Sequence, residues 1–236
     1  MRDIAMRALR LSLRGSTNSP ISASMARLAL ATLLAVWPLS EADAHPHVFV
    51  DVALAFESDG AGHLTGVRVT WSYDDFFSLL ILADMGLDPD GDGALTEAEL
   101  ERLKGFDLVE WPEGFEGDLY LHAGEEKIAL DHPVPTDIRL EAGRIVASHR
   151  RSFGPVPADG LRVEPYDPTY YVDYTLTGPV TLPQGCAYTI TEPDIDESQR
   201  AFRDMLAQLS AEEQYTGVEV GNLFSETMVI SCRARS

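Results

Sequence analysis

Apolar and polar residues alternate along two neighbouring segments near the start of the chain. Residues 48–56 (VFVDVALAF) and 64–72 (LTGVRVTWS) are rich in β-branched and aromatic side chains at alternate positions, which is typical of strands with one buried face. An Asp-Gly-Ala-Gly sequence at 59–62 separates them. We therefore expect a β-hairpin whose loop is longer than two residues.

The apolar spacing changes to that of helices over residues 74–85, 96–104 and 196–209. The first two segments flank an acidic loop, and the third has the apolar stripe of an amphipathic helix. The helical side chains that we expect in the core are Phe76, Phe77, Leu79, Leu80, Leu100, Leu103, Phe202, Met205, Leu206 and Leu209.

Short strand-like runs punctuated by Pro and Gly fill the remainder of the chain. They are residues 119–122, 127–130, 144–148, 170–177, 187–191 and 227–232. The pattern predicts an α+β fold that is mainly β. We expect one antiparallel β-rich domain over residues 45–236, with an EF-hand-like helix-loop-helix inserted at about 74–104 and one late amphipathic helix.

The acidic loop, residues 88–99 (DPDGDGALTEAE), has the spacing of an EF-hand calcium loop. Gly93 permits the sharp bend at position 6. The expected oxygen ligands of Ca²⁺ are Asp88, Asp90, Asp92, the backbone carbonyl of Ala94, Thr96 and Glu99. Because the sequence contains one such loop, it favours a structural calcium site over a sensor. The alternative is an acidic turn that binds no ion.

The N-terminal 44 residues have the pattern of a signal peptide. An apolar run at 28–39 follows Arg27, and small residues at 42–44 match a cleavage site. Met25 is a second candidate start. We expect a periplasmic protein that is not inserted in the membrane after cleavage; the alternative is an uncleaved membrane tether.

Charge and cysteine content agree with export. The formal net charge of −20 disfavours binding to nucleic acid and to anionic lipid, although such a charge also serves solubility. Cys186 and Cys232 are the two cysteines of the chain. An even count in an oxidising compartment predicts a disulfide, with two buried free thiols as the alternative.

Cleavage after residue 44 would make His45 the first residue of the mature chain. The α-amine and the rings of His45 and His47 would then offer nitrogen ligands that suit Ni²⁺, Co²⁺, Zn²⁺ or Cu²⁺. Pro46 has no amide N–H, so the usual chelate of an N-terminal third-position histidine cannot form. The alternative is two histidines at the entry to a strand.

Several motifs together resemble an uncharacterised bacterial family usually labelled the periplasmic component of an ABC-type transport system. They are His45-Pro46-His47, Trp71-Ser72-Tyr73-Asp74, the loop 88–99, Tyr166-Asp167-Pro168 with Tyr170-Tyr171, and Cys232. Members look like partners of nickel/cobalt-type membrane transporters. The resemblance implies an accessory protein of transition-metal transport, with His45 and His47 as ligands.

Two further functions remain open. One is a calcium-stabilised adaptor that binds a membrane transporter without carrying transition metal. The other is an enzyme, which we do not expect because the chain has no nucleophile elbow, phosphate-binding glycine loop or His-Glu-x-x-His pattern.

A group of aromatic and acidic residues either lines a pocket or packs a sheet: Tyr166, Asp167, Tyr170, Tyr171, Asp173 and Tyr174.

Overall fold

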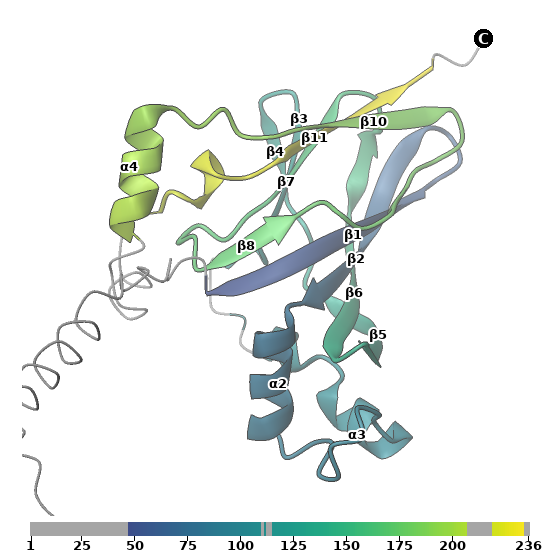
Figure 1. Cartoon of the computed structure of the whole chain (residues 1–236). Coiled ribbons are helices and arrows are strands. Elements are labelled where there is room, and N and C mark those ends of the chain that lie inside the picture. Colours follow the sequence, from purple (N-terminus) through teal and green to yellow (C-terminus); the bar gives the residue numbers. More distant parts are fainter. Residues whose placement is uncertain (1–46, 110, 112–114, 207–218, 234–236) are drawn as a thin grey trace, which may run out of the picture. The chain divides into compact units, whose positions relative to one another are not determined.

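A computed structural model describes residues 47–109, 111, 115–206 and 219–233 of the chain. The expected signal peptide, the alternative start at Met25, and His45 lie outside the described residues. Two sheets and three α-helices in the described part give an α+β fold that is mainly β, as predicted (Figure 1).

The first sheet has the strand order β5-β6-β2-β1-β8, and β9 also pairs with β1. Its strands are β1 (Val48–Ser58), β2 (His63–Tyr73), β5 (Val134–Glu141), β6 (Arg144–Pro157), β8 (Val172–Thr175) and β9 (Val180–Thr181). The hairpin of β1 and β2 is confirmed. However, β1 pairs in parallel with β8 and β9, so the sheet is mixed and not wholly antiparallel as expected.

The second sheet is antiparallel, with the order β10-β11-β7-β3-β4. Its strands are β3 (Leu119–Ala123), β4 (Glu126–Ile128), β7 (Leu161–Pro165), β10 (Cys186–Thr191) and β11 (Thr227–Cys232). The predicted disulfide is present: Cys186 and Cys232 are opposite one another at the end of the β10–β11 ladder and are bonded.

Both sheets contribute to one cluster of buried apolar side chains. Along β1 every second residue from Val48 to Phe56 is buried, which is the alternation seen in the sequence. The second sheet supplies Leu119, Leu121 and Met228 to the same cluster. The core therefore lies between the two sheets, and the ends of the strands carry the functional loops.

A helical insertion follows β2 and consists of α2 (Asp75–Asp84), α3 (Glu97–Leu103) and a 3₁₀ turn, η1 (Phe106–Leu108). Asp74 caps α2 by accepting a hydrogen bond from the amide of Phe77 at 2.8 Å. Buried Ser78 on α2 accepts a hydrogen bond from the amide of Ile145 on β6 at 2.9 Å. The insertion is thus tied to β6 of the first sheet.

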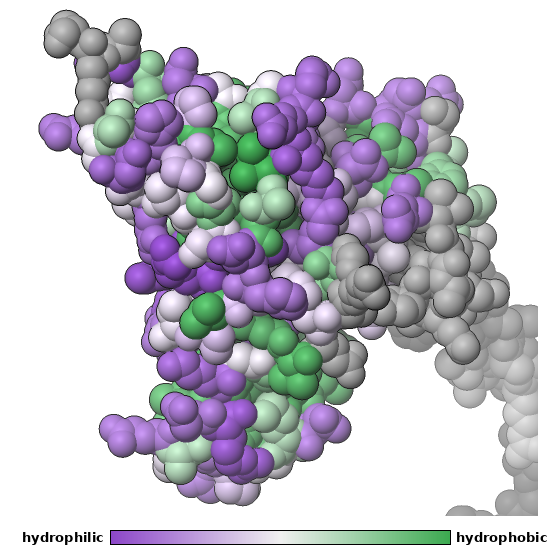
Figure 2. All heavy atoms as spheres, turned by 180° about the vertical axis from the view of Figure 1, so that it is seen from behind, coloured by the Kyte–Doolittle hydropathy of each residue, from purple (hydrophilic) through white to green (hydrophobic). Residues whose placement is uncertain are grey.

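The expected burial of the α2 side chains was wrong for three of the four. Phe76, Leu79 and Leu80 are 67%, 61% and 50% exposed, whereas Phe77 is half-buried. The reason is that α2 packs through one face only, on which Ser78 and Leu82 are buried. Seen from behind, the lobe formed by the insertion carries exposed apolar side chains (Figure 2).

The late helix, α4 (Glu197–Leu206), begins with a capping pair. The amide of Asp196 donates to the side chain of Gln199 at 2.9 Å, and the amide of Gln199 donates to the side chain of Asp196 at 2.8 Å. Phe202 packs with a small cluster that includes Tyr170 and Phe224. Leu209 lies outside the described residues. Among the described residues, no helix is both long enough and apolar enough to cross a bilayer.

Candidate functional site

The acidic loop brings three carboxylates together. Ligand atoms of Asp88, Asp90 and Asp92 all lie within 4.8 Å of one another. The carboxylate of Asp88 accepts hydrogen bonds from the amides of Asp92 and Gly93 at 3.0 and 3.2 Å. Converging carboxylate oxygens on a tightly turned loop are the donor set that hard divalent cations prefer, so these residues fit a metal ion.

Glu99 is not part of this group of three, but its carboxylate reaches back to the start of the loop. Its Oε2 accepts hydrogen bonds from the hydroxyl and the amide of Thr96 at 2.7 and 2.9 Å, in a capping box that starts α3. Its Oε1 accepts a hydrogen bond from the amide of Asp88 at 3.2 Å, which closes the loop. The hydrogen bonds from Thr96 are the main cause that lowers the pKa of Glu99.

The loop is also fixed to the core and to α2. Leu87 before the loop and Leu103 after it are buried, and Leu95 at position 8 packs against the same core cluster. The guanidinium of Arg102 donates a hydrogen bond to the carbonyl of Met85 at 2.6 Å, joining α3 to α2. An ion in this loop would therefore act on the anchoring of both helices.

Of the two N-terminal histidines, the structure describes His47. Its amide donates to the carbonyl of Tyr171 at 3.0 Å, and its ring centroid lies 4.9 Å from that of Tyr171. His47 is thus held at the start of β1 beside β8. His45 lies outside the described residues, so the predicted pair is not tested.

The remaining histidines do not come together in the described part of the chain. His63 and His122 contact carboxylates at 3.1 and 3.3 Å, and His132 lies near Trp111. His149 is 1% exposed, and its ring lies edge-on to Trp71 at a centroid distance of 4.7 Å. Burial is the main cause that lowers its pKa to about 3, so it is a neutral core residue at pH 7.

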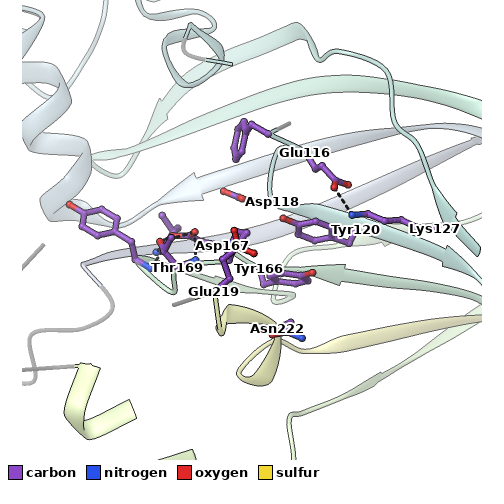
Figure 3. A pocket seen from close by; sticks show the side chains of 13 residues that line it. Glu116, Asp118, Tyr120, Lys127, Tyr166, Asp167, Thr169, Glu219 and Asn222 are labelled. Carbon is purple, nitrogen blue, oxygen red and sulfur yellow. Dashed lines mark hydrogen bonds and ion pairs between the residues drawn. The ribbon is translucent and has the colours of Figure 1, made fainter. Parts of the chain in front are cut away.

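A cavity of about 830 Å³ opens beside β3 and the turn that follows β7 (Figure 3). Three residues of the group singled out in the sequence line it: Tyr166, Asp167 and Tyr171. Tyr170 instead packs in the small cluster near α4, and Tyr174 lies buried. The sequence analysis missed Asp118 and Tyr120, because neither stands in a motif and only the pairing of β3 with β7 brings them to the turn.

Asp118 is the least expected member of this cavity. It is 7% exposed, and its Oδ2 accepts a hydrogen bond from the hydroxyl of Tyr174 at 2.9 Å. Burial, reinforced by the negative charge of Asp167, raises the pKa of Asp118 to about 8. Among the described residues, its buried Oδ1 has no hydrogen-bond partner.

Comparison with known proteins gives a family. No curated protein matches the chain. The model of the family described as "Protein of unknown function (DUF1007)" matches residues 29–232, and the chain therefore belongs to this family.

Proposed function

We propose that the protein is a periplasmic metal-binding accessory protein of a transition-metal transport system of the nickel, cobalt or zinc type, stabilised by Ca²⁺ in the loop 88–99. The observation that carries the metal-binding part is the convergence of Asp88, Asp90 and Asp92. The disulfide is consistent with an extracytoplasmic compartment. The transition-metal part rests on the family resemblance of the motif His45-Pro46-His47. It also rests on the position of this motif at the N-terminus of the chain after cleavage.

Calcium binding is tested through folding stability. Extracellular EF-hands bind Ca²⁺ with dissociation constants of roughly 10⁻⁴–10⁻³ M. The free energy of unfolding in 10 mM Ca²⁺ should therefore exceed its value in excess chelator by about 1.4–2.7 kcal/mol. Asp90 is the variant of choice, because no hydrogen bond joins its carboxylate to the described residues and Asp90→Asn therefore leaves the loop backbone intact. Glu101→Gln, on the exposed side of α3, is the matched control.

The expected outcome is that urea denaturation shows the calcium effect in the native protein and in Glu101→Gln and a reduced effect in Asp90→Asn. Equal unfolding free energies of the native protein in calcium and in chelator would exclude a calcium site in this loop.

Transition-metal binding is tested by isothermal titration of the protein, purified from the periplasm as processed there, with Ni²⁺, Co²⁺, Zn²⁺ and Cu²⁺ at saturating Ca²⁺. We expect tight binding that is lost in His45→Ala and His47→Ala and kept in the control His63→Ala, whose ring contacts Asp59 in a turn. Absence of binding by the native protein would refute this half of the proposal.

The exposed apolar face of α2 favours the second candidate, an adaptor that binds a membrane transporter. Phe76, Leu79 and Leu80 would be unusual on a surface that contacts water alone, and they lie on the helix that precedes the acidic loop. We expect Leu79→Glu to abolish binding to a reconstituted nickel/cobalt-type transporter. The control Val134→Glu, on exposed β5, should bind as the native protein does; equal binding by both variants would remove α2 from the interface.

A further inference from the structure

The cavity beside β3 combines an aromatic wall with an excess of negative charge. Its carboxylates come from Glu116, Asp118, Asp167 and Glu219, and Lys127 is the one cationic side chain among the lining residues. Lys127 is already paired with Glu116 at 2.5 Å. Asp167 and Glu219 thus remain without a cationic partner inside the cavity, whereas Asp118 holds a proton near pH 7 while the cavity is empty. Two unpaired carboxylates attract positively charged ligands.

The turn after β7 is built rigidly. The Oδ1 of Asp167 accepts a hydrogen bond from the amide of Thr169 at 2.9 Å, and its Oδ2 accepts from the amides of Tyr171 and Val172 at 2.9 and 3.0 Å. The carbonyl of Pro168 accepts hydrogen bonds from the amides of residues 220 and 221. The wall is therefore held in place before any ligand arrives, which lowers the entropic cost of binding.

Asp118 supplies a second and independent sign of a ligand. Its side chain is more than nine-tenths buried in the cavity wall, and its Oδ1 has no hydrogen-bond partner among the described residues. A buried polar atom without a partner costs about 1–3 kcal/mol. A cationic ligand beside Asp118 would favour release of its proton to solvent and would supply the missing hydrogen-bond donor.

The aromatic wall already holds an alkylammonium group. The rings of Tyr120 and Tyr166 are stacked, with centroids 4.0 Å apart and an interplanar angle of 15°. The ammonium of Lys127 lies 4.8 Å from the centroid of the Tyr120 ring (Figure 3). Cations are attracted to tyrosine faces at this distance, so the chain itself shows the kind of group that this wall accepts.

We propose that this cavity binds a small organic cation, an amine or guanidinium compound with an apolar body, between the Tyr120–Tyr166 wall and the carboxylates of Asp118, Asp167 and Glu219. The residues that line this cavity include neither His47 nor the loop 88–99, although Tyr171, which lines it, contacts His47. The volume of about 830 Å³ is in the range of cavities that hold metabolite-sized ligands. A bare metal ion fits less well, because the group of three metal-ligating side chains found in the described residues is Asp88, Asp90 and Asp92, not these carboxylates.

The test is isothermal titration of the periplasmically processed protein with agmatine and with spermidine in amine-free buffer. The diol 1,6-hexanediol is the uncharged probe of similar body, and Ni²⁺ and Ca²⁺ are the metal probes. We expect saturable binding of at least one amine and no binding of the diol. Binding of the diol with equal affinity, binding of metal at this cavity instead of the amines, or no binding of either amine would overturn the proposal.

Substitutions of residues that line the cavity test whether the amine binds there. Asp118→Asn keeps the size of the side chain and an acceptor for Tyr174, and we expect it to weaken amine binding at least tenfold. Tyr166→Leu should weaken it at least threefold, and the control Glu101→Gln should leave it unchanged. Should Asp118→Asn fail to fold, Glu219→Gln on the exposed rim replaces it, with an expected threefold loss; unchanged affinity in the charge variants that fold would refute the assignment.

Discussion

The buried carboxyl of Asp118 should leave a measurable mark on the pH dependence of folding. The groups around it are Tyr174, which donates to it, Asp167, whose charge raises its pKa, and Arg151, whose charge lowers it. Burial outweighs the favourable contacts and raises the pKa of Asp118 to about 8 in the folded protein. In the unfolded chain the pKa of an aspartate is about 3.9.

The sign and size of the effect follow from these two values. Between pH 4 and pH 8 the folded protein holds one proton on Asp118 that the unfolded chain has lost, so the free energy of unfolding falls as pH rises. The slope from this group is about 1 kcal/mol per pH unit, which amounts to roughly 2–3 kcal/mol between pH 5 and pH 7. Asp118→Asn cannot ionise and lacks this contribution.

The assay is urea denaturation of the native protein and of Asp118→Asn at pH 5, 6 and 7 in amine-free buffer. A constant offset between the two proteins does not affect the test, because the difference in their unfolding free energies should change by about 2–3 kcal/mol over this range in favour of the variant. Asp84→Asn, exposed on α2, controls for the loss of a surface charge. A difference that stays constant from pH 5 to pH 7 would refute a buried, protonated Asp118.

Three further predictions concern other parts of the fold. Replacing Cys186 and Cys232 by Ser should cost about 4 kcal/mol of unfolding free energy, because the bond closes a loop with a sequence separation of 46, as measured by urea denaturation without reductant. The pKa of His149 is lowered to about 3 in the folded protein, so this residue reduces the free energy of unfolding as pH falls below about 6.5. His149→Phe should make the free energy of unfolding, measured by urea denaturation, less dependent on pH in this range. An unchanged pH dependence would contradict a buried neutral His149. In Gly221→Ala the new Cβ would lie 1.7 Å from the carbonyl oxygen of Asp167, so we expect a loss of about 2 kcal/mol or more and a loss of amine binding, measured by denaturation and titration.

Local patterns in the sequence were sufficient for much of the fold. The alternation in β1 and β2 and the spacing of the acidic loop each depend on residues close in the chain, and both the hairpin and the converging aspartates are present. By contrast, β5 and β7 were missed. In β5, Pro135 and exposed Val134 weaken the strand pattern, and β7 is only five residues long. Pairing with neighbouring strands, which a single segment does not reveal, makes both of them strands.

The candidate sites, too, were predictable only where their residues lie close together in the sequence. The three aspartates of the loop were found because their chemistry and spacing are encoded within twelve residues. The cavity was only half found, since Tyr120 faces Tyr166 through the register of β3 with β7. The exposed face of α2 was missed because an apolar helix shows no sign in its sequence of which side is left uncovered.

The place of β1 in the first sheet has a consequence for how the chain reaches this structure. One edge of β1 is covered by β2, which follows at once, but the other is covered only by residues 172–181. While the chain emerges from its N-terminus onward, that second edge stays open until three quarters of the protein has been made. An open strand edge invites pairing with other chains, so a holding chaperone during synthesis or passage would protect this strand, and truncation before residue 172 would leave an aggregation-prone fragment.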